Sequence, residues 1–287
     1  MLKSLETKLR AARTSMMRSF FETPAGIRAL VQSLPPRIKY VVLEGEEFDL
    51  LLDPRDYVGK RIAVSGNWHA AETAAFLEFY TATFGTRPDR IMLEIGAHIG
   101  TQSLQFATCR LFSRVVSVEP MPENHAVLSR NIRLNGLDDV LSAVNCAVAD
   151  KAGKAVMQAD AVNSGAHSLR AATDTPSGRS VEVEVLTVGG VLERADASAG
   201  DVGCVWIDAE GFEFEIVRSA LEAGIGQAMF HVEFTPRFYG EAKRAEFIAF
   251  LRECFGAVHF LTENGIEPAT FDDLGKVTIQ QDIVLTN

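Results

Sequence analysis

The chain has little cysteine and no cysteine pairing pattern. Four cysteines are spread over 287 residues, without a CxxC motif or a cluster of Cys and His. We therefore predict buried free thiols in a reducing compartment and no thiolate metal site. Positive charge is not in excess either: the formal net charge is −10. This charge disfavours nonspecific binding to nucleic acid, where Lys and Arg must replace counterions along the phosphates.

Long hydrophobic runs are also absent. No segment reaches the roughly 18 apolar residues that span a bilayer, and basic residues between positions 3 and 13 interrupt any secretory leader. We expect a cytoplasmic protein without a transmembrane segment. Residues 1–33 predict amphipathic helices with basic residues. A packed extension and a membrane-surface or partner helix both remain open for them.

Strand and helix patterns alternate from residue 91 onward. This rhythm predicts right-handed βαβ crossovers and a doubly wound, mostly parallel α/β sheet. The C-terminal segments VHFLT and VTIQQDIVLTN predict an antiparallel pair at the edge of the sheet. The strand patterns lie at 91–95, 115–119, 141–149, 204–208 and 229–234, and the helical patterns at 101–110, 123–135, 212–223 and 241–255.

An N-terminal extension precedes this alternation. Residues 38–53 alternate and break at a glycine, which predicts a β-hairpin, and residues 69–85 predict a helix that a glycine closes. We divide the chain into a helical and hairpin extension, 1–64, and an α/β domain, 65–287.

One segment interrupts the alternation. Residues 151–160 and 179–188 resemble strands, and a polar stretch separates them. We interpret this segment as a hairpin inserted near the strand ends. His167 and Ser168 in its loop are candidate contacts to a substrate, although an ordinary exposed loop is the competing interpretation.

The stretch MLEIGAHIGTQSLQFA runs from an apolar strand through two glycines into a helical pattern. Gly96 and Gly100 permit a tight turn and a close approach of the backbone to a ligand. Ligands of such sheets bind beyond the carboxyl ends of the strands. Glu119 ends the next strand, where a carboxylate can bind ribose hydroxyls. Together these features predict a ligand that contains adenosine.

Two details favour S-adenosyl-L-methionine over NAD. The glycine spacing is not GxGxxG, and Glu94 would place a negative charge beside the helix N-terminus where NAD leaves its pyrophosphate. The ammonium and sulfonium groups of S-adenosyl-L-methionine are instead attracted by a carboxylate. An NAD-dependent oxidoreductase remains the alternative enzyme. A non-catalytic module that binds S-adenosyl-L-methionine is the alternative from another functional class.

Four stretches resemble the FkbM family of S-adenosylmethionine-dependent methyltransferases over about residues 65–287. They are LEIGAHIGTQSLQFA, VVSVEPMPENHAVLSRNIRLNG, VNCAVADKAG, and VWIDAEGFEFEIVRSA with HVEF after it. The resemblance implies a class I methyltransferase (Rossmann-like) fold: a mostly parallel, seven-stranded sheet with an antiparallel edge strand. It also implies O-methylation of a hydroxyl on a small molecule or glycan. Homo-oligomerisation remains open.

The resemblance also assigns cofactor contacts by position. His98 stands where the family has Asn, and Glu94 stands where it has Asp. The assigned contacts are Glu94, Gly96, Ala97, His98, Gly100 and Ser103 at the methionine portion, Glu119 and Pro120 at the ribose, Asn145, Cys146 and Ala147 at the adenine, and Asp208 at the sulfonium.

Asp208 and Glu210 follow a central strand, and two carboxylates at a buried strand end are costly unless paired or used. We predict that Asp208 positions cofactor or acceptor. Glu210 is either a general base or a cap of the following helix. Glu213 and Glu215 are predicted on a solvated helix face.

His231 and Glu233 alternate on the next strand and so share a face. Both are candidate catalytic residues, and a hydrogen-bonded core position is the competing interpretation for His231. Asp208, Glu210 and Glu233 carry oxygen ligands suited to a metal. Nothing in the sequence establishes that these side chains converge, so no metal is predicted.

Overall fold

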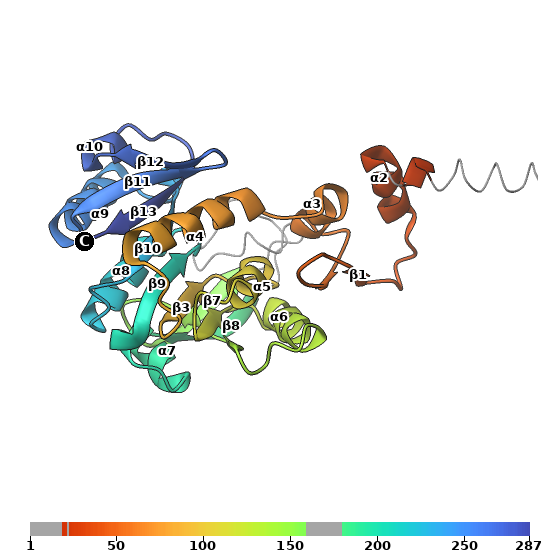
Figure 1. Ribbon diagram of the computed structural model, residues 1–287, viewed down its shortest axis with the longest axis horizontal. Coiled ribbons are helices and arrows are strands. Elements are labelled where there is room, and N and C mark those ends of the chain that lie inside the picture. The colour runs from red at the N-terminus through yellow and green to blue at the C-terminus, as the bar shows by residue number, and fades with distance from the viewer. Residues whose placement is uncertain (1–18, 22, 159–179) are drawn as a thin grey trace, which may run out of the picture.

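The computed structural model describes residues 19–21, 23–158 and 180–287. Its centre is an eight-stranded sheet with the order β12-β11-β13-β10-β9-β3-β4-β5 (Figure 1). The strands β10, β9, β3, β4 and β5 run parallel, which confirms the expected mostly parallel α/β fold. The bounds are β3 Ile91–Ile95, β4 Arg114–Val118, β5 Leu141–Val144, β9 Val202–Ile207, β10 Met229–Phe234, β11 Ala257–Thr262, β12 Gly265–Ala269 and β13 Gln281–Thr286.

The C-terminal part differs from the expected seven strands with an antiparallel pair at the edge. β13 pairs antiparallel with β11, but it lies between β10 and β11. The edge is formed by β12, which the sequence analysis missed, within the described part of the chain. The physical reason is burial on both faces: Ile283, Val284 and Leu285 are all fully buried, which suits an interior strand.

Helices cover both faces of the sheet, as the alternation predicted. One core joins one sheet face to α4 (Ala70–Phe84), α5 (Thr101–Thr108) and α6 (Pro122–Leu134). The other core joins the opposite face to α7 (Val188–Arg194), α8 (Glu213–Glu222) and α9 (Glu241–Cys254), with α10 (Phe271–Leu274) beside them. Within the described residues, no helix is both long enough and apolar enough to cross a bilayer.

The N-terminal elements are α2 (Pro24–Ser33), the predicted hairpin of β1 (Val41–Leu43) and β2 (Leu50–Leu52), and α3 (Tyr57–Ser65). The apolar side chains of β2 and α3 belong to the same core as α4 to α6. Asn131 of α6 holds the hairpin in place through hydrogen bonds. Its carboxamide accepts from the Leu51 N–H at 2.7 Å and donates to the Ile99 carbonyl at 2.8 Å. The extension is thereby tied to the turn that follows β3.

The predicted strand 141–149 is two strands. β5 ends at Val144, and β6 (Ala147–Val148) belongs to a separate three-stranded sheet with β7 (Gly153–Gln158) and β8 (Ser180–Leu186). β7 and β8 form the expected inserted hairpin. His167 and Ser168, in the predicted loop of that hairpin, lie outside the described residues.

Candidate functional site

A cavity of about 380 Å³ opens at the carboxyl ends of the parallel strands. This volume falls in the range of roughly 300–1,000 Å³ that is usual for small-molecule sites. Its walls come from the segments that follow β3, β4, β5, β9 and β10, and from α3 and the start of α4. The chain thus places its cavity where parallel sheets bind ligands.

The turn after β3 depends on glycine at two positions. Gly96 has φ +95°, and a Cβ there would lie 1.6 Å from the carbonyl oxygen of Asp208. Gly100 has φ +93°, and its Cβ would lie 2.5 Å from Cδ1 of Leu128. The backbone of β3 therefore passes directly against the strand end that carries Asp208. His98, between the two glycines, also has a positive φ of 50° and lines the cavity.

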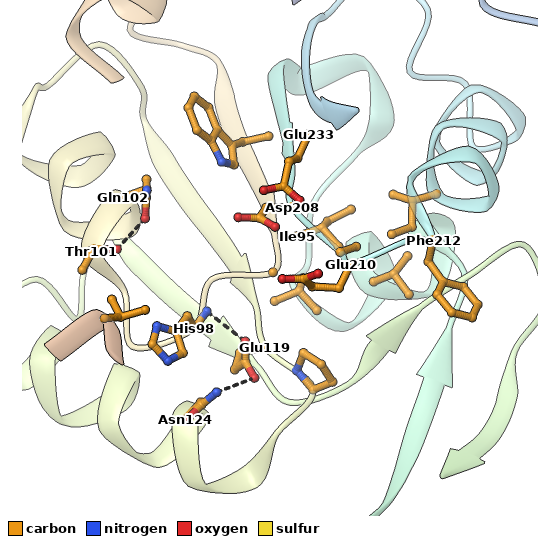
Figure 2. A pocket seen from close by; sticks show the side chains of 18 of the residues that line it. Ile95, His98, Thr101, Gln102, Glu119, Asn124, Asp208, Glu210, Phe212 and Glu233 are labelled. Carbon is orange, nitrogen blue, oxygen red and sulfur yellow. Dashed lines mark hydrogen bonds between the residues drawn. The ribbon is translucent and has the colours of Figure 1, made fainter. Parts of the chain in front are cut away.

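Glu119 lines the cavity beside this turn (Figure 2). Its Oε2 accepts the His98 N–H at 2.8 Å, and its Oε1 accepts the Met121 N–H at 2.9 Å. Asn124 donates a longer hydrogen bond of 3.4 Å to Oε1. Burial raises the pKa of Glu119 to about 7, and these hydrogen bonds oppose the shift. Oε2 keeps a second lone pair, and the bond from Asn124 to Oε1 is long, so hydroxyl groups of a ligand can still bind to this carboxylate.

Glu94 lies below the turn rather than in the cavity wall. It is 1% exposed, and its Oε2 accepts hydrogen bonds from the hydroxyls of Ser103 and Ser117. Burial raises its pKa to about 7, against the lowering effect of both hydroxyls. Its position lets it support the glycine turn from inside the protein. Ala97, Gly100 and Ser103 are likewise not among the lining residues.

Two of the three predicted adenine contacts line the cavity in the structure, and the third does not. Cys146 and Ala147 line the cavity, whereas Asn145 is exposed and donates to the carbonyl groups of Glu119 and Pro120 at 2.7 and 3.0 Å. Asn145 therefore braces the turn after β4, and Pro120 lines the cavity beside it. The apolar wall on this side also includes residues that the sequence analysis missed: Val148, which follows Ala147 in β6, and Met157, Phe212 and Ile216 from other elements.

Three carboxylates converge at the other end of the cavity (Figure 2). Asp208, Glu210 and Glu233 each offer a carboxylate oxygen within 4.8 Å of the others. Burial, and next the charge of Glu210, raise the pKa of Asp208 well above its usual value. Burial, and next the charge of Asp208, do the same to the pKa of Glu233. The pKa of Glu210 rises to about 7, again chiefly through burial.

His231 shares this region, because it lies two residues before Glu233 on β10. Its ring stacks on Trp206 with a centroid distance of 3.4 Å. Nε2 lies 3.6 Å from Oδ1 of Asp282, the residue that pairs with Glu233 across β10 and β13. The structure thus brings together all four predicted catalytic residues: Asp208, Glu210, Glu233 and His231.

The prediction that Glu213 lies on a solvated helix face is wrong. Glu213 is fully buried, and its Oε1 accepts the N–H groups of Gly211 and Ala209 at 2.8 and 3.3 Å. The Tyr239 hydroxyl donates to Oε2. Glu213 therefore satisfies two backbone donors in the turn before α8. Glu210 has φ +48° and directs its carboxylate toward Asp208 (Figure 2).

The mouth of the cavity has an aromatic and basic wall. Tyr57 and Trp68 meet edge to face at 6.4 Å, and the Arg61 guanidinium lies 5.7 Å from the Trp68 ring. All three line the cavity together with His69. No motif marks these residues, since α3 and the start of α4 meet the cavity only through packing.

A match to a known protein family covers most of the chain segments that form this site. Residues 94–255 match the profile of the methyltransferase FkbM domain. The chain belongs to the FkbM methyltransferase family. The matched range contains the glycine turn, Glu119 and the three converging carboxylates of this FkbM-family protein. A search of curated proteins found no match.

The solved structures that are similar to this chain include the following three. TYW2 of Pyrococcus horikoshii in complex with MeSAdo is 15% identical, with 86% of this chain and 72% of that chain covered and a TM-score of 0.43. TYW2 of Methanocaldococcus jannaschii in complex with AdoMet is 10% identical (88% and 87% covered, TM-score 0.46). The METTL16 MTase domain is 12% identical (93% and 81% covered, TM-score 0.44).

Proposed function

We propose that this FkbM-family protein is an S-adenosyl-L-methionine-dependent O-methyltransferase that acts on a hydroxyl of a small molecule or glycan. One observation supports this most: a single cavity has a hydroxyl-binding carboxylate beside an apolar slot at one end and a cluster of carboxylates at the other. The first end suits adenosine, and the second suits a proton acceptor.

The residues around Glu119 fit the nucleoside. Glu119 would bind the ribose hydroxyls through the lone pairs that its backbone donors leave. Cys146, Ala147 and Phe212 offer apolar surface to the adenine ring. Gly96 and His98 would face the methionine portion, with Glu94 holding the turn in place from below.

When bound, S-adenosyl-L-methionine supplies an already activated methyl group on a sulfonium. The protein then has to align an acceptor oxygen and remove its proton. Glu210 is the proposed base, because a carboxyl whose pKa is raised to about 7 both accepts a proton near neutral pH and is partly ionised there. Asp208 is the proposed positioning group for the acceptor, with Glu233 beside it.

The mouth of the cavity is the proposed acceptor side. Tyr57 and Trp68 present flat apolar rings, and Arg61 and His69 present donors. Such a surface suits a sugar or another ring that carries hydroxyl groups. Tyr57 is 49% exposed, so its ring is available to an incoming molecule.

A labelled methyl donor tests this proposal. The full chain is incubated with S-adenosyl-L-methionine carrying a labelled methyl group and with a fractionated cell extract. We expect label in a product that survives mild alkali, because methyl ethers resist conditions that hydrolyse methyl esters. Glu210→Gln should lower transfer at least about 100-fold, whereas Glu253→Gln, an exposed change on α9, should not change it. Cofactor binding without transfer to any fraction would instead support a non-catalytic binding module.

A further inference from the structure

We propose that Asp208, Glu210 and Glu233 form a binding site for one hard divalent cation, such as Mg²⁺, Mn²⁺ or Ca²⁺. The geometry is the first argument. Two oxygens that bind the same ion lie at most twice the metal–oxygen distance apart, which is about 4.2 Å for Mg²⁺ and about 5 Å for Ca²⁺. The three carboxylate oxygens lie within 4.8 Å of one another. An all-oxygen donor set selects hard cations over thiophilic metals.

The charge of the region is the second argument. Asp282 pairs with Glu233 across β10 and β13, so a fourth carboxylate stands beside the three. No hydrogen bond from a described residue reaches the Asp208 side chain. Arg237 lines the same cavity, and Arg61 lies at its mouth beside Trp68. Four carboxylates exceed the charge of two arginines, and because like charges at this spacing repel, a divalent cation would offset the remainder.

His231 provides an independent argument for a ligand at this end of the cavity. It is 2% exposed, and neither Nδ1 nor Nε2 has a hydrogen-bond partner within the described chain. A buried imidazole without partners costs free energy. The ring lines the cavity, and its Nε2 edge points toward Asp282 at 3.6 Å. From there it can donate to a water molecule or carboxylate in the shell around the ion, as groups that orient metal ligands do.

The cation would hold the acceptor's hydroxyl oxygen at the carboxylate end of the cavity, and Glu210, bound through one carboxylate oxygen, would keep the other oxygen for the proton. That role depends on the proposed methyl transfer, whereas cation binding itself does not. The two can therefore fail separately. Mn²⁺ binding is measured without any nucleoside, and binding of S-adenosylhomocysteine is measured without any metal.

Titration of the full chain with Mn²⁺, followed by electron paramagnetic resonance, tests the site. We expect one saturable Mn²⁺ per chain, displaced by excess Mg²⁺ or Ca²⁺. Asp208→Asn and Glu233→Gln should each weaken binding at least about tenfold, since loss of a ligand costs no less than loss of a supporting group. The matched controls Asp139→Asn and Glu253→Gln change exposed carboxylates elsewhere and should bind like the wild type.

Two further measurements test whether the variants fold and whether the His231 imidazole contributes to cation binding. Without metal, Asp208→Asn and Glu233→Gln should melt no lower than the wild type, because each removes repulsion. His231→Phe keeps a flat ring against Trp206 and removes both nitrogens, so Mn²⁺ affinity should fall about tenfold. Unchanged affinity in that variant would overturn the role given to His231. No saturable binding up to millimolar Mn²⁺, or equal binding by Asp208→Asn, would overturn the site.

Discussion

Replacement of Glu119 by Ala should weaken binding of S-adenosylhomocysteine by roughly 100-fold. Glu119 is 5% exposed and faces the cavity with both oxygens held by backbone donors. A hydrogen bond to a charged group contributes about 1.5–3 kcal/mol. Two such bonds to a ribose diol therefore contribute at least about 3 kcal/mol, and each 1.4 kcal/mol is a factor of ten.

The same substitution also releases the N–H groups of His98 and Met121, so a disordered turn could weaken binding without any contact to ribose. A ligand pair separates these causes. In the wild type, the 2′-deoxy analogue of S-adenosylhomocysteine should bind about tenfold more weakly than the parent compound. In Glu119→Ala the two ligands should bind equally, because the group that distinguishes them is gone.

Isothermal titration calorimetry measures the four affinities, those of S-adenosylhomocysteine and its 2′-deoxy analogue for the wild type and for Glu119→Ala. Glu123→Ala is the matched control, an exposed glutamate four residues along that does not line the cavity. It should reproduce the wild-type affinities. An equal 2′-hydroxyl effect in wild type and Glu119→Ala, or wild-type affinity in the variant, would refute the ribose assignment.

Three further predictions concern stability. Gly96→Ala should lower the free energy of unfolding in urea by at least about 2 kcal/mol, since its Cβ would overlap the Asp208 carbonyl at a positive φ. Glu213→Ala should lower it by about 2–4 kcal/mol, because buried N–H donors lose their acceptor; Glu222→Ala, at the end of α8, is the control. The raised pKa of Glu94 means that the folded state holds a proton between pH 4.5 and about 7 that the unfolded state releases. Stability without ligand should thus fall as pH rises through this window. Glu94→Gln should make this fall less steep in urea titrations at several pH values, while Glu119 and Glu210, whose pKa values are also raised to about 7, maintain the rest of it.

Much of the fold could be predicted because its signals are local. Apolar runs of five or six residues between helical patterns mark β3, β9 and β10, which are buried throughout. The same holds for the glycine turn, because its two glycines are close together in the chain. The order of the C-terminal strands was not predictable in this way. Pairing of β13 with β10 depends on which faces are buried, and that is decided by contacts far apart in sequence.

In the candidate site, too, some features could be predicted from local sequence and others depend on tertiary contacts. Glu119 and Asp208 follow strands, and their strand-end positions place them at the cavity. Glu94 also lies near the end of a strand, but its side chain points into the protein. The hydroxyls of Ser103 and Ser117 donate to its carboxylate there. Glu213 follows the helical pattern of an exposed face, yet the turn before α8 draws its carboxylate back over the backbone.

The sequence by itself determined the alternating α/β architecture, the glycine turn and the strand ends that carry Glu119, Asp208 and Glu233, because hydrophobic spacing and turn residues act over a few positions. Only the tertiary structure decided that three carboxylates converge, that the His231 nitrogens lie beside them without a hydrogen bond from the described residues, and that α3 forms a wall of the cavity. These features depend on the directions of side chains from elements that lie far apart in the sequence, and packing sets those directions.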